Sequence, residues 1–105
     1  MAVVHATNDN FNKEVLASKE PVVIDFWASW CMPCRIMAPR FEEASNEMKG
    51  VKFVKLSTEE MPEMAEKFEV MSIPTLVLLK NGKEVDRMVG ALPKEYLTGW
   101  LKKHL

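Results

Sequence analysis

Apolar positions along the chain follow two periods, and their order predicts alternating strands and helices. Short segments rich in β-branched and aromatic residues indicate strands, whereas apolar residues three and four positions apart indicate helices. Strands are predicted at residues 3–6, 22–28, 51–56, 75–79 and 83–89. Helices are predicted at residues 11–16, 34–48, 61–68 and 93–105. The pattern therefore alternates strand and helix until a final pair of strands and a closing helix.

Two of the predicted strands differ in polarity, which indicates their places in a sheet. Residues 22–28 are nearly all apolar, as expected of a strand that is buried on both faces. Residues 83–89 carry several charged side chains, as edge strands commonly do. The Asn81-Gly82 pair between the last two strands favours a type I′ turn, which would make these strands an antiparallel hairpin.

Two of the helical segments carry apolar stripes that should face the sheet. In the longer helix the stripe consists of Cys34, Met37, Ala38, Phe41, Ser45 and Met48. In the last helix it consists of Tyr96, Leu97, Trp100, Leu101 and Leu105. Because strand–helix–strand units favour parallel strands, the order of elements predicts an α/β fold in which helices cover both faces of a mixed sheet.

Composition and charge narrow the class of protein. The length of 105 residues predicts a single domain over residues 1–105. The composition, 48% hydrophobic and 28% charged, is typical of an ordinary soluble globular protein. A formal net charge of −1 gives no electrostatic reason to expect a nucleic-acid or membrane partner. No apolar run is long enough to span a bilayer, and the N-terminal residues lack a signal-peptide pattern. We therefore expect a monomer in the cytoplasm.

The only two cysteines, Cys31 and Cys34, are separated by two residues and follow the most apolar strand. In a reducing compartment this spacing between a strand and a helix is typical of a redox motif. Cys31 would lie just before the helix, where unpaired N–H groups, the helix dipole and nearby Arg35 favour a thiolate. Cys34 falls on the buried stripe. We therefore predict that Cys31 attacks a substrate disulfide and that Cys34 resolves the mixed disulfide.

A zinc site is the alternative interpretation of the cysteine pair. A structural zinc ion needs about four ligands. The only histidines, His5 and His104, lie at opposite ends of the chain and lack the spacing of zinc ligands. The redox interpretation is therefore preferred, and no metal is expected.

Asp25 is a charged residue within an apolar strand, six positions before Cys31. Burial of a carboxyl group raises its pKa unless the group is paired, and such a group can take and return the proton that thiol chemistry releases. The alternative role of Asp25 is to anchor local hydrogen bonds. Lys55 interrupts an apolar strand face, and it would approach Asp25 if the two strands were neighbours. Otherwise its ammonium would extend from the surface into solvent.

Several side chains near the cysteine pair are candidates for contact with a substrate. Trp30 is adjacent to the first cysteine, and Met32 and Met71 lie in loops near the expected site, where flexible thioethers would form an apolar patch. Pro74 directly precedes an apolar strand, and the Ile73–Pro74 bond could be cis at modest energetic cost. From this short segment alone, an ordinary trans turn is the better expectation.

Taken together, these motifs resemble the thioredoxin family. The resemblance covers nearly the whole chain and rests on ordered motifs: Asp25-Phe26-Trp27-Ala28, Trp30-Cys31-x-Pro33-Cys34, Pro39, Ile73-Pro74-Thr75, Asn81-Gly82 and Gly90. It implies the thioredoxin fold, a central mixed five-stranded sheet flanked by four helices. It also implies a protein-disulfide reductase that carries electrons by dithiol–disulfide exchange, needs no bound cofactor and is restored by a separate thioredoxin reductase.

The resemblance also implies roles for individual residues. Cys31 resembles the family's nucleophile and Cys34 its resolving thiol, and the two form the redox disulfide. Asp25 resembles the buried proton-transfer carboxylate, Lys55 its neighbouring lysine, and Pro74 the cis-proline that faces the disulfide. The apolar surface on which disulfide-containing target proteins dock would include Trp30, Met32, Pro33, Ile73, Val89 and Gly90.

Two residues depart from the family pattern, and two other functions are alternatives. The family usually has glycine at the position of Met32 and lysine at the position of Arg35, which leaves the reduction potential and the choice of reductase open. Exported oxidases and isomerases usually carry histidine at the position of Pro33, so a reductase is favoured here. A binding module of the same fold, acting without turnover, would not need both cysteines together with Asp25.

Overall fold

The computed structural model describes residues 3–105, so the first two residues of the predicted domain lie outside it. Along the chain the elements are β1 (Val3–His5), η1 (Asn12–Leu16), β2 (Val22–Trp27), α1 (Met32–Glu47), β3 (Lys52–Ser57), α2 (Pro62–Lys67), β4 (Thr75–Lys80), β5 (Lys83–Val89) and α3 (Lys94–His104). The element η1 is a short π-helix, and the others labelled α are α-helices. The predicted order of strands and helices is confirmed.

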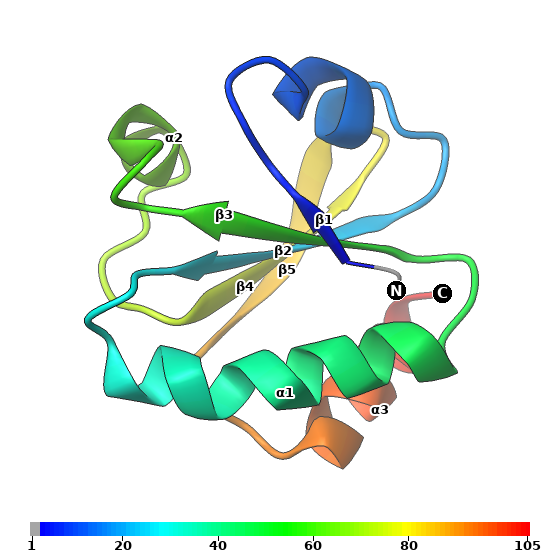
Figure 1. The fold of residues 1–105 in the computed structure, drawn as a ribbon. Helices are drawn as coiled ribbons and strands as arrows, with labels where there is room; N and C mark the ends of the chain where they lie inside the picture. Colours follow the sequence, from blue (N-terminus) through cyan, green and yellow to red (C-terminus); the bar gives the residue numbers. More distant parts are fainter. Residues whose placement is uncertain (1–2) are drawn as a thin grey trace.

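The strands form a five-stranded mixed sheet in the order β1-β3-β2-β4-β5. The strands β1, β3 and β2 run parallel, whereas β4 is antiparallel to both β2 and β5. In Figure 1, α1 and α3 lie below the sheet, and η1 and α2 lie above it. The predicted α/β fold, a central mixed sheet flanked by four helices, is confirmed.

The central strand β2 supplies side chains to both hydrophobic layers. Ile24 and Phe26 are fully buried in the layer under η1 and α2, where the rings of Phe26 and Phe68 lie 5.5 Å apart. Val23 packs in the opposite layer, with α1 and α3. Because side chains alternate along a strand, Asp25 lies on the same face as Val23 and points into the layer between the sheet and α1.

The apolar stripe predicted for the last helix is only partly correct. Leu97 and Leu101 are fully buried in the layer that α3 shares with α1. Tyr96 and Leu105 are exposed, so their assignment to the inner stripe is wrong. Tyr96 is rotated by about 100° from Leu97 around the helix axis, and Leu105 follows the last helical residue. Trp100 lies between these extremes and is half-buried.

The β4–β5 hairpin has the predicted turn and the predicted place at an edge of the sheet. Asn81 (φ 53°) and Gly82 (φ 77°) both have positive φ, as a type I′ turn requires. The register between the strands shifts between Leu78 and Leu79, which marks a β-bulge. The sequence pattern did not predict this bulge, because apolar and charged residues are interspersed along β5.

Replacing Phe41 by alanine should lower the free energy of unfolding by about 3–5 kcal/mol, because a fully buried ring would leave a cavity. Phe41 lies on the inner face of α1, and its ring centroid is 5.1 Å from that of Phe53. Denaturant unfolding monitored by circular dichroism measures the loss. Ile36→Ala, at an exposed position of the same helix, is the control and should change stability by about 0.5 kcal/mol or less. Equal losses in the two variants would contradict this account of the core.

Candidate active site

The redox pair lies where the buried strand β2 passes into α1. Cys31 is the N-cap of α1, with extended φ and ψ of −91° and 112°. Pro33 lies in the first helical turn, where its missing N–H has no intrahelical partner to lose. The backbone N–H of Cys34 donates to Cys31 Sγ over 3.3 Å. The helix N-terminus therefore directs a hydrogen bond at the Cys31 sulfur, as the sequence predicted.

Cys31 and Cys34 form a disulfide whose Cα atoms lie 5.3 Å apart. Both residues are nearly inaccessible, with exposed fractions of 4% and 3%. They pack together with Ala28, and Trp27 and Ile73 border this small cluster. Burial alone therefore does not distinguish the two cysteines, and their difference lies in what each one faces.

A groove of about 510 Å³ opens beside the disulfide on the side of Cys31. The residues that line it come from the motif, from the region of α2 and from the loop before β4: Trp30, Cys31, Met32, Pro33, Thr58, Ala65, Val70, Met71, Ser72 and Ile73. Trp30 and Met71 are 71% and 93% exposed. The groove thus joins a reactive sulfur to a largely apolar surface, as expected of a docking site for a protein substrate.

The groove unites four of the predicted docking residues: Trp30, Met32, Pro33 and Ile73. The sequence predicted Met71 as part of an apolar patch near the site. It did not predict the other groove residues that lie in or near α2 and the loop after it, which are Thr58, Ala65, Val70 and Ser72. Thr58, Ala65 and Val70 carry no chemical signal of their own. Only the packing of α2 over the end of the sheet brings them to the cysteine pair.

The peptide bond between Ile73 and Pro74 is cis. The local sequence favoured a trans bond, whereas the family resemblance implied the cis form, and the structure agrees with the resemblance. The Ile73 carbonyl oxygen lies 3.7 Å from Cys31 Sγ. The Gly90 N–H donates to the Pro74 carbonyl over 2.8 Å, and this places the Val89–Gly90 segment next to the proline rather than in the groove wall.

Two charged side chains, Arg35 and Glu59, brace the turn before the motif, which the sequence did not predict. The Arg35 guanidinium donates through Nε and Nη2 to the Ser29 carbonyl, at 3.1 and 2.9 Å. Glu59 accepts from the Ser29 N–H at 2.7 Å and from its hydroxyl at 3.1 Å. These hydrogen bonds hold the pKa of Glu59 below its ordinary value. Arg35 therefore stabilises the turn in addition to placing a cation near the pair.

Asp25 is fully buried on the face of the sheet that α1 covers. Neither of its carboxylate oxygens has a hydrogen-bond partner among the residues that the structure describes. Burial raises its pKa from 3.8 to about 7, and the charge of Lys55 opposes this rise. Asp25 can therefore exist in both protonation states near neutral pH, as expected of a carboxyl group in a buried strand.

Lys55 is the β3 neighbour of Asp25, because the two residues are paired in the parallel ladder. Its Nζ lies 4.6 Å from the centroid of the Trp27 ring. The sequence had left open whether Lys55 approaches Asp25 or extends into solvent, and the structure places it in the first arrangement. The positive charge of this half-buried residue favours the charged form of Asp25.

Two further properties of the described residues concern metal ions and membranes. Within residues 3–105, no three His, Cys, Asp or Glu side chains gather closely enough to hold a metal ion. None of the helices in the same range is both long and apolar enough to cross a membrane.

Asp25→Asn should stabilise the oxidised protein by an amount that grows with pH. The carboxyl loses its proton near pH 4 in the unfolded chain and near pH 7 in the folded one, so burial of the charged form costs free energy above this window. From pH 4 to pH 8 the difference between variant and wild type should rise by up to about 4 kcal/mol. Denaturant unfolding at several pH values measures it. Asp9→Asn, at an exposed position, should show no such trend. A pH-independent difference for Asp25→Asn would refute the raised pKa.

The similarity of this chain to known proteins supports the interpretation of the site as a redox centre. A sequence profile of the family described as Thioredoxin matches residues 2–103. Thioredoxin 1 of Nostoc sp. is 46% identical over 105 residues, covering 99% of this chain and 98% of that protein. Thioredoxin of Synechocystis sp. is also 46% identical with the same coverage, and Thioredoxin 1 of Synechococcus elongatus is 47% identical over the full length of both chains. The chain therefore belongs to the thioredoxin family and is a thiol–disulfide oxidoreductase.

Proposed function

We propose that Cys31 is the attacking thiol in the reduction of protein disulfides and that Cys34 resolves the intermediate. The observation that carries this assignment is the position of the Cys31 sulfur. It accepts a hydrogen bond from the Cys34 N–H at the start of α1, and Cys31 lines the groove. Hydrogen bonding at a helix N-terminus stabilises a thiolate, which is the reactive form. Cys34 lies behind it on the buried side of α1, where an incoming target does not reach it first.

The exchange transfers two electrons in two steps. The Cys31 thiolate attacks one sulfur of a target disulfide, which forms a mixed disulfide and releases the other target sulfur as a thiolate that takes up a proton. Cys34 then gives up its proton and attacks Cys31 Sγ, which releases the second target thiolate and leaves the disulfide present in the structure. A separate reductase returns two electrons and two protons and restores the dithiol.

Asp25 is the group that takes the proton from Cys34 in the second step. It lies on the face of the sheet that α1 covers. A pKa of about 7 lets it accept a proton and give it back near neutral pH. Lys55, beside it in the ladder, supports the charged form that must be present before the transfer. Because no residue in the described range 3–105 forms a hydrogen bond with the carboxylate, it is available for this role.

The groove is the place where an extended segment of a target protein would lie with its disulfide against Cys31. Trp30, Met32, Pro33 and Ile73 would contact it directly, and Val89 and Gly90 would border it on the far side of Pro74.

The partners of this reaction are disulfide-containing proteins and a thioredoxin reductase. The net charge of −1 supports neither nucleic-acid nor membrane binding. We place the protein in the cytoplasm as a monomer.

Substitution of either cysteine separates the two steps. Cys31→Ser should reduce insulin disulfides, with dithiothreitol as electron source, no faster than dithiothreitol alone. Cys34→Ser should accumulate a mixed disulfide with its target through Cys31, detectable by non-reducing electrophoresis and mass spectrometry. Both variants should keep the wild-type circular dichroism spectrum. Activity in Cys31→Ser would show that the nucleophile is assigned wrongly.

Asp25→Asn should slow resolution of the mixed disulfide by about tenfold or more near pH 7, because general base catalysis would be lost. The deficit should shrink toward pH 9, where more of the Cys34 thiol ionises without assistance. Single-turnover measurements against pH test this expectation, with the exposed Asp9→Asn as the matched control. A pH profile identical to that of the wild type would remove Asp25 from the mechanism.

A further inference from the structure

The loop that joins α2 to β4, residues 69–74, forms one wall of the groove. Met71 and Ile73 both line the groove from this loop. The Ile73 carbonyl oxygen lies 3.7 Å from Cys31 Sγ. A displacement of the loop would therefore change both the surface that a target meets and the surroundings of the attacking sulfur.

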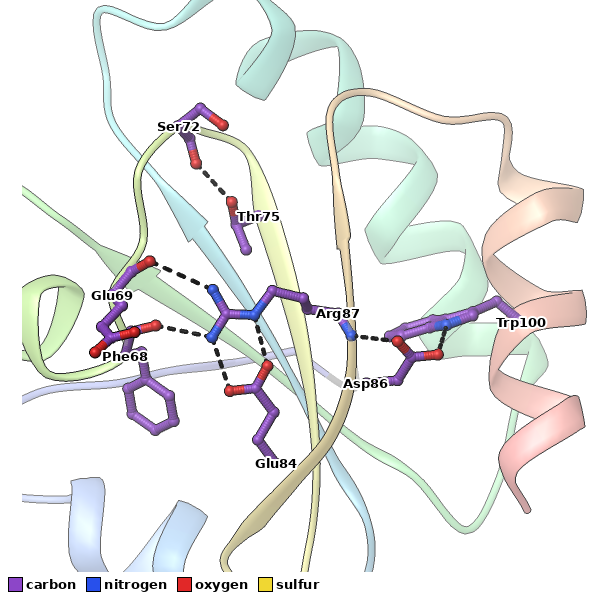
Figure 2. A network of polar contacts seen from close by, with 8 residues as sticks. All are labelled: Phe68, Glu69, Ser72, Thr75, Glu84, Asp86, Arg87 and Trp100. Carbon is purple, nitrogen blue, oxygen red and sulfur yellow. Dashed lines mark hydrogen bonds and ion pairs between the residues drawn. The ribbon is translucent and has the colours of Figure 1, made fainter.

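At its β4 end the loop is held by two hydrogen bonds. The Thr75 hydroxyl donates to the Ser72 carbonyl over 2.5 Å (Figure 2). The Gly90 N–H donates to the Pro74 carbonyl over 2.8 Å. This end is thus fixed by β4 and by the segment that follows β5.

At its α2 end the loop begins with a residue in a costly conformation. Glu69 has φ 54°, in the left-handed region that favours glycine. The Val70 N–H donates to the Ala65 carbonyl and the Glu69 N–H to the Glu66 carbonyl, which is the Schellman pattern of helix ends. Glycine is the usual residue at this position, so a glutamate here needs support from elsewhere in the structure.

Arg87 of β5 supplies that support from the neighbouring part of the sheet. Figure 2 shows its guanidinium between the end of α2 and the side chain of Glu84. It donates to the carbonyls of Phe68 and Glu69, at 2.8 and 3.4 Å. Two further hydrogen bonds, at 2.5 and 2.7 Å, join it to both carboxylate oxygens of Glu84. This bidentate pair fixes the plane of the guanidinium, so its other donors have a defined direction.

The bulge in β5 makes this arrangement possible. Residues three apart in a regular strand point to opposite faces, so Glu84 and Arg87 would not meet. The register leaves Val85 as an extra residue, which returns Glu84 to the face of Arg87. Asp86 points to the other face, where it accepts from Trp100 Nε1 over 2.9 Å (Figure 2). The strand that carries Arg87 is therefore itself held against α3.

We propose that Arg87, oriented by Glu84, is a positioning residue for protein-disulfide reduction. It holds the left-handed residue Glu69 and thereby sets where the following loop presents Met71 to the target. Arg87 itself does not line the groove, so its effect passes through the loop. This inference rests on the proposed function of the groove as the docking site.

The test compares Arg87→Met with the wild type on substrates of different size. The variant keeps an apolar stem and loses every guanidinium hydrogen bond. We expect KM for insulin to rise at least threefold and kcat to stay within twofold. Reduction of a small aromatic disulfide, 5,5′-dithiobis(2-nitrobenzoate), should stay within twofold of the wild-type rate, because so small a molecule contacts little of the groove wall. Glu84→Gln should show the same trend more weakly.

Lys52→Met is the matched control. It removes another ion pair of similar exposure, in which Lys52 Nζ lies 3.1 Å from Glu14 Oε1, with side chains 23% and 28% exposed against 32% each for Arg87 and Glu84. This pair lies at the start of β3, at the opposite end of the strand from the groove. Its loss should leave KM for insulin unchanged. An equal rise in KM in both variants would overturn the proposal, because it would indicate a general loss of stability.

A second substitution tests whether Arg87 acts through Glu69. Glycine adopts positive φ without steric cost, so adding Glu69→Gly to Arg87→Met should bring KM for insulin back to within twofold of the wild type. Failure of this rescue would overturn the route through Glu69.

Amide hydrogen exchange gives a readout without activity. Exchange at Glu69 and Val70, whose N–H groups donate to Glu66 and Ala65, should accelerate at least threefold in Arg87→Met but not in Lys52→Met. Unchanged exchange would overturn the positioning role. A wild-type protein that failed to reduce insulin would instead overturn the proposed function, so the two failures are distinguishable.

Discussion

The reactivity of the site depends on the hydrogen bond from the Cys34 N–H to Cys31 Sγ, and this bond depends on how the sheet positions α1. It exists because β2 ends one short turn before α1 begins, which leaves the sulfur at a helix end whose first N–H groups have no intrahelical partner. The position of α1 depends in turn on the buried layer that contains Phe41 and Phe53. The reactive sulfur is thus held at the start of a helix that packs into the hydrophobic core.

The same side of the sheet contains a group whose burial is energetically unfavourable. Asp25 occupies a position in β2 that an apolar residue would fill at lower cost, since burial of an unpaired carboxylate is unfavourable. Lys55 relieves only part of this cost. A group that titrates near neutral pH inside a core is accordingly a departure from optimal stability, and such departures cluster where chemistry requires them.

Much of this arrangement could be predicted from the sequence because it depends on local patterns. The apolar run of β2, the stripe of α1, the Asn81-Gly82 turn and the spacing of the cysteines each have a direct structural meaning. The wall of the groove could not be predicted, because Ala65 and Val70 acquire their role only through packing. Tyr96 shows the reverse error, since an apolar ring near the stripe need not be buried.

The Arg87 network escaped prediction for a different reason. Periodicity assigns Glu84 and Arg87 to opposite faces, and only the extra residue in β5 brings them together. That extra residue, Val85, has another consequence. The strand β5 lies at an edge of the sheet, where a regular row of N–H and C=O groups would invite pairing with a strand of another chain. Because the bulge interrupts that row among charged side chains, the irregularity that aligns Arg87 also protects the sheet against edge-to-edge aggregation.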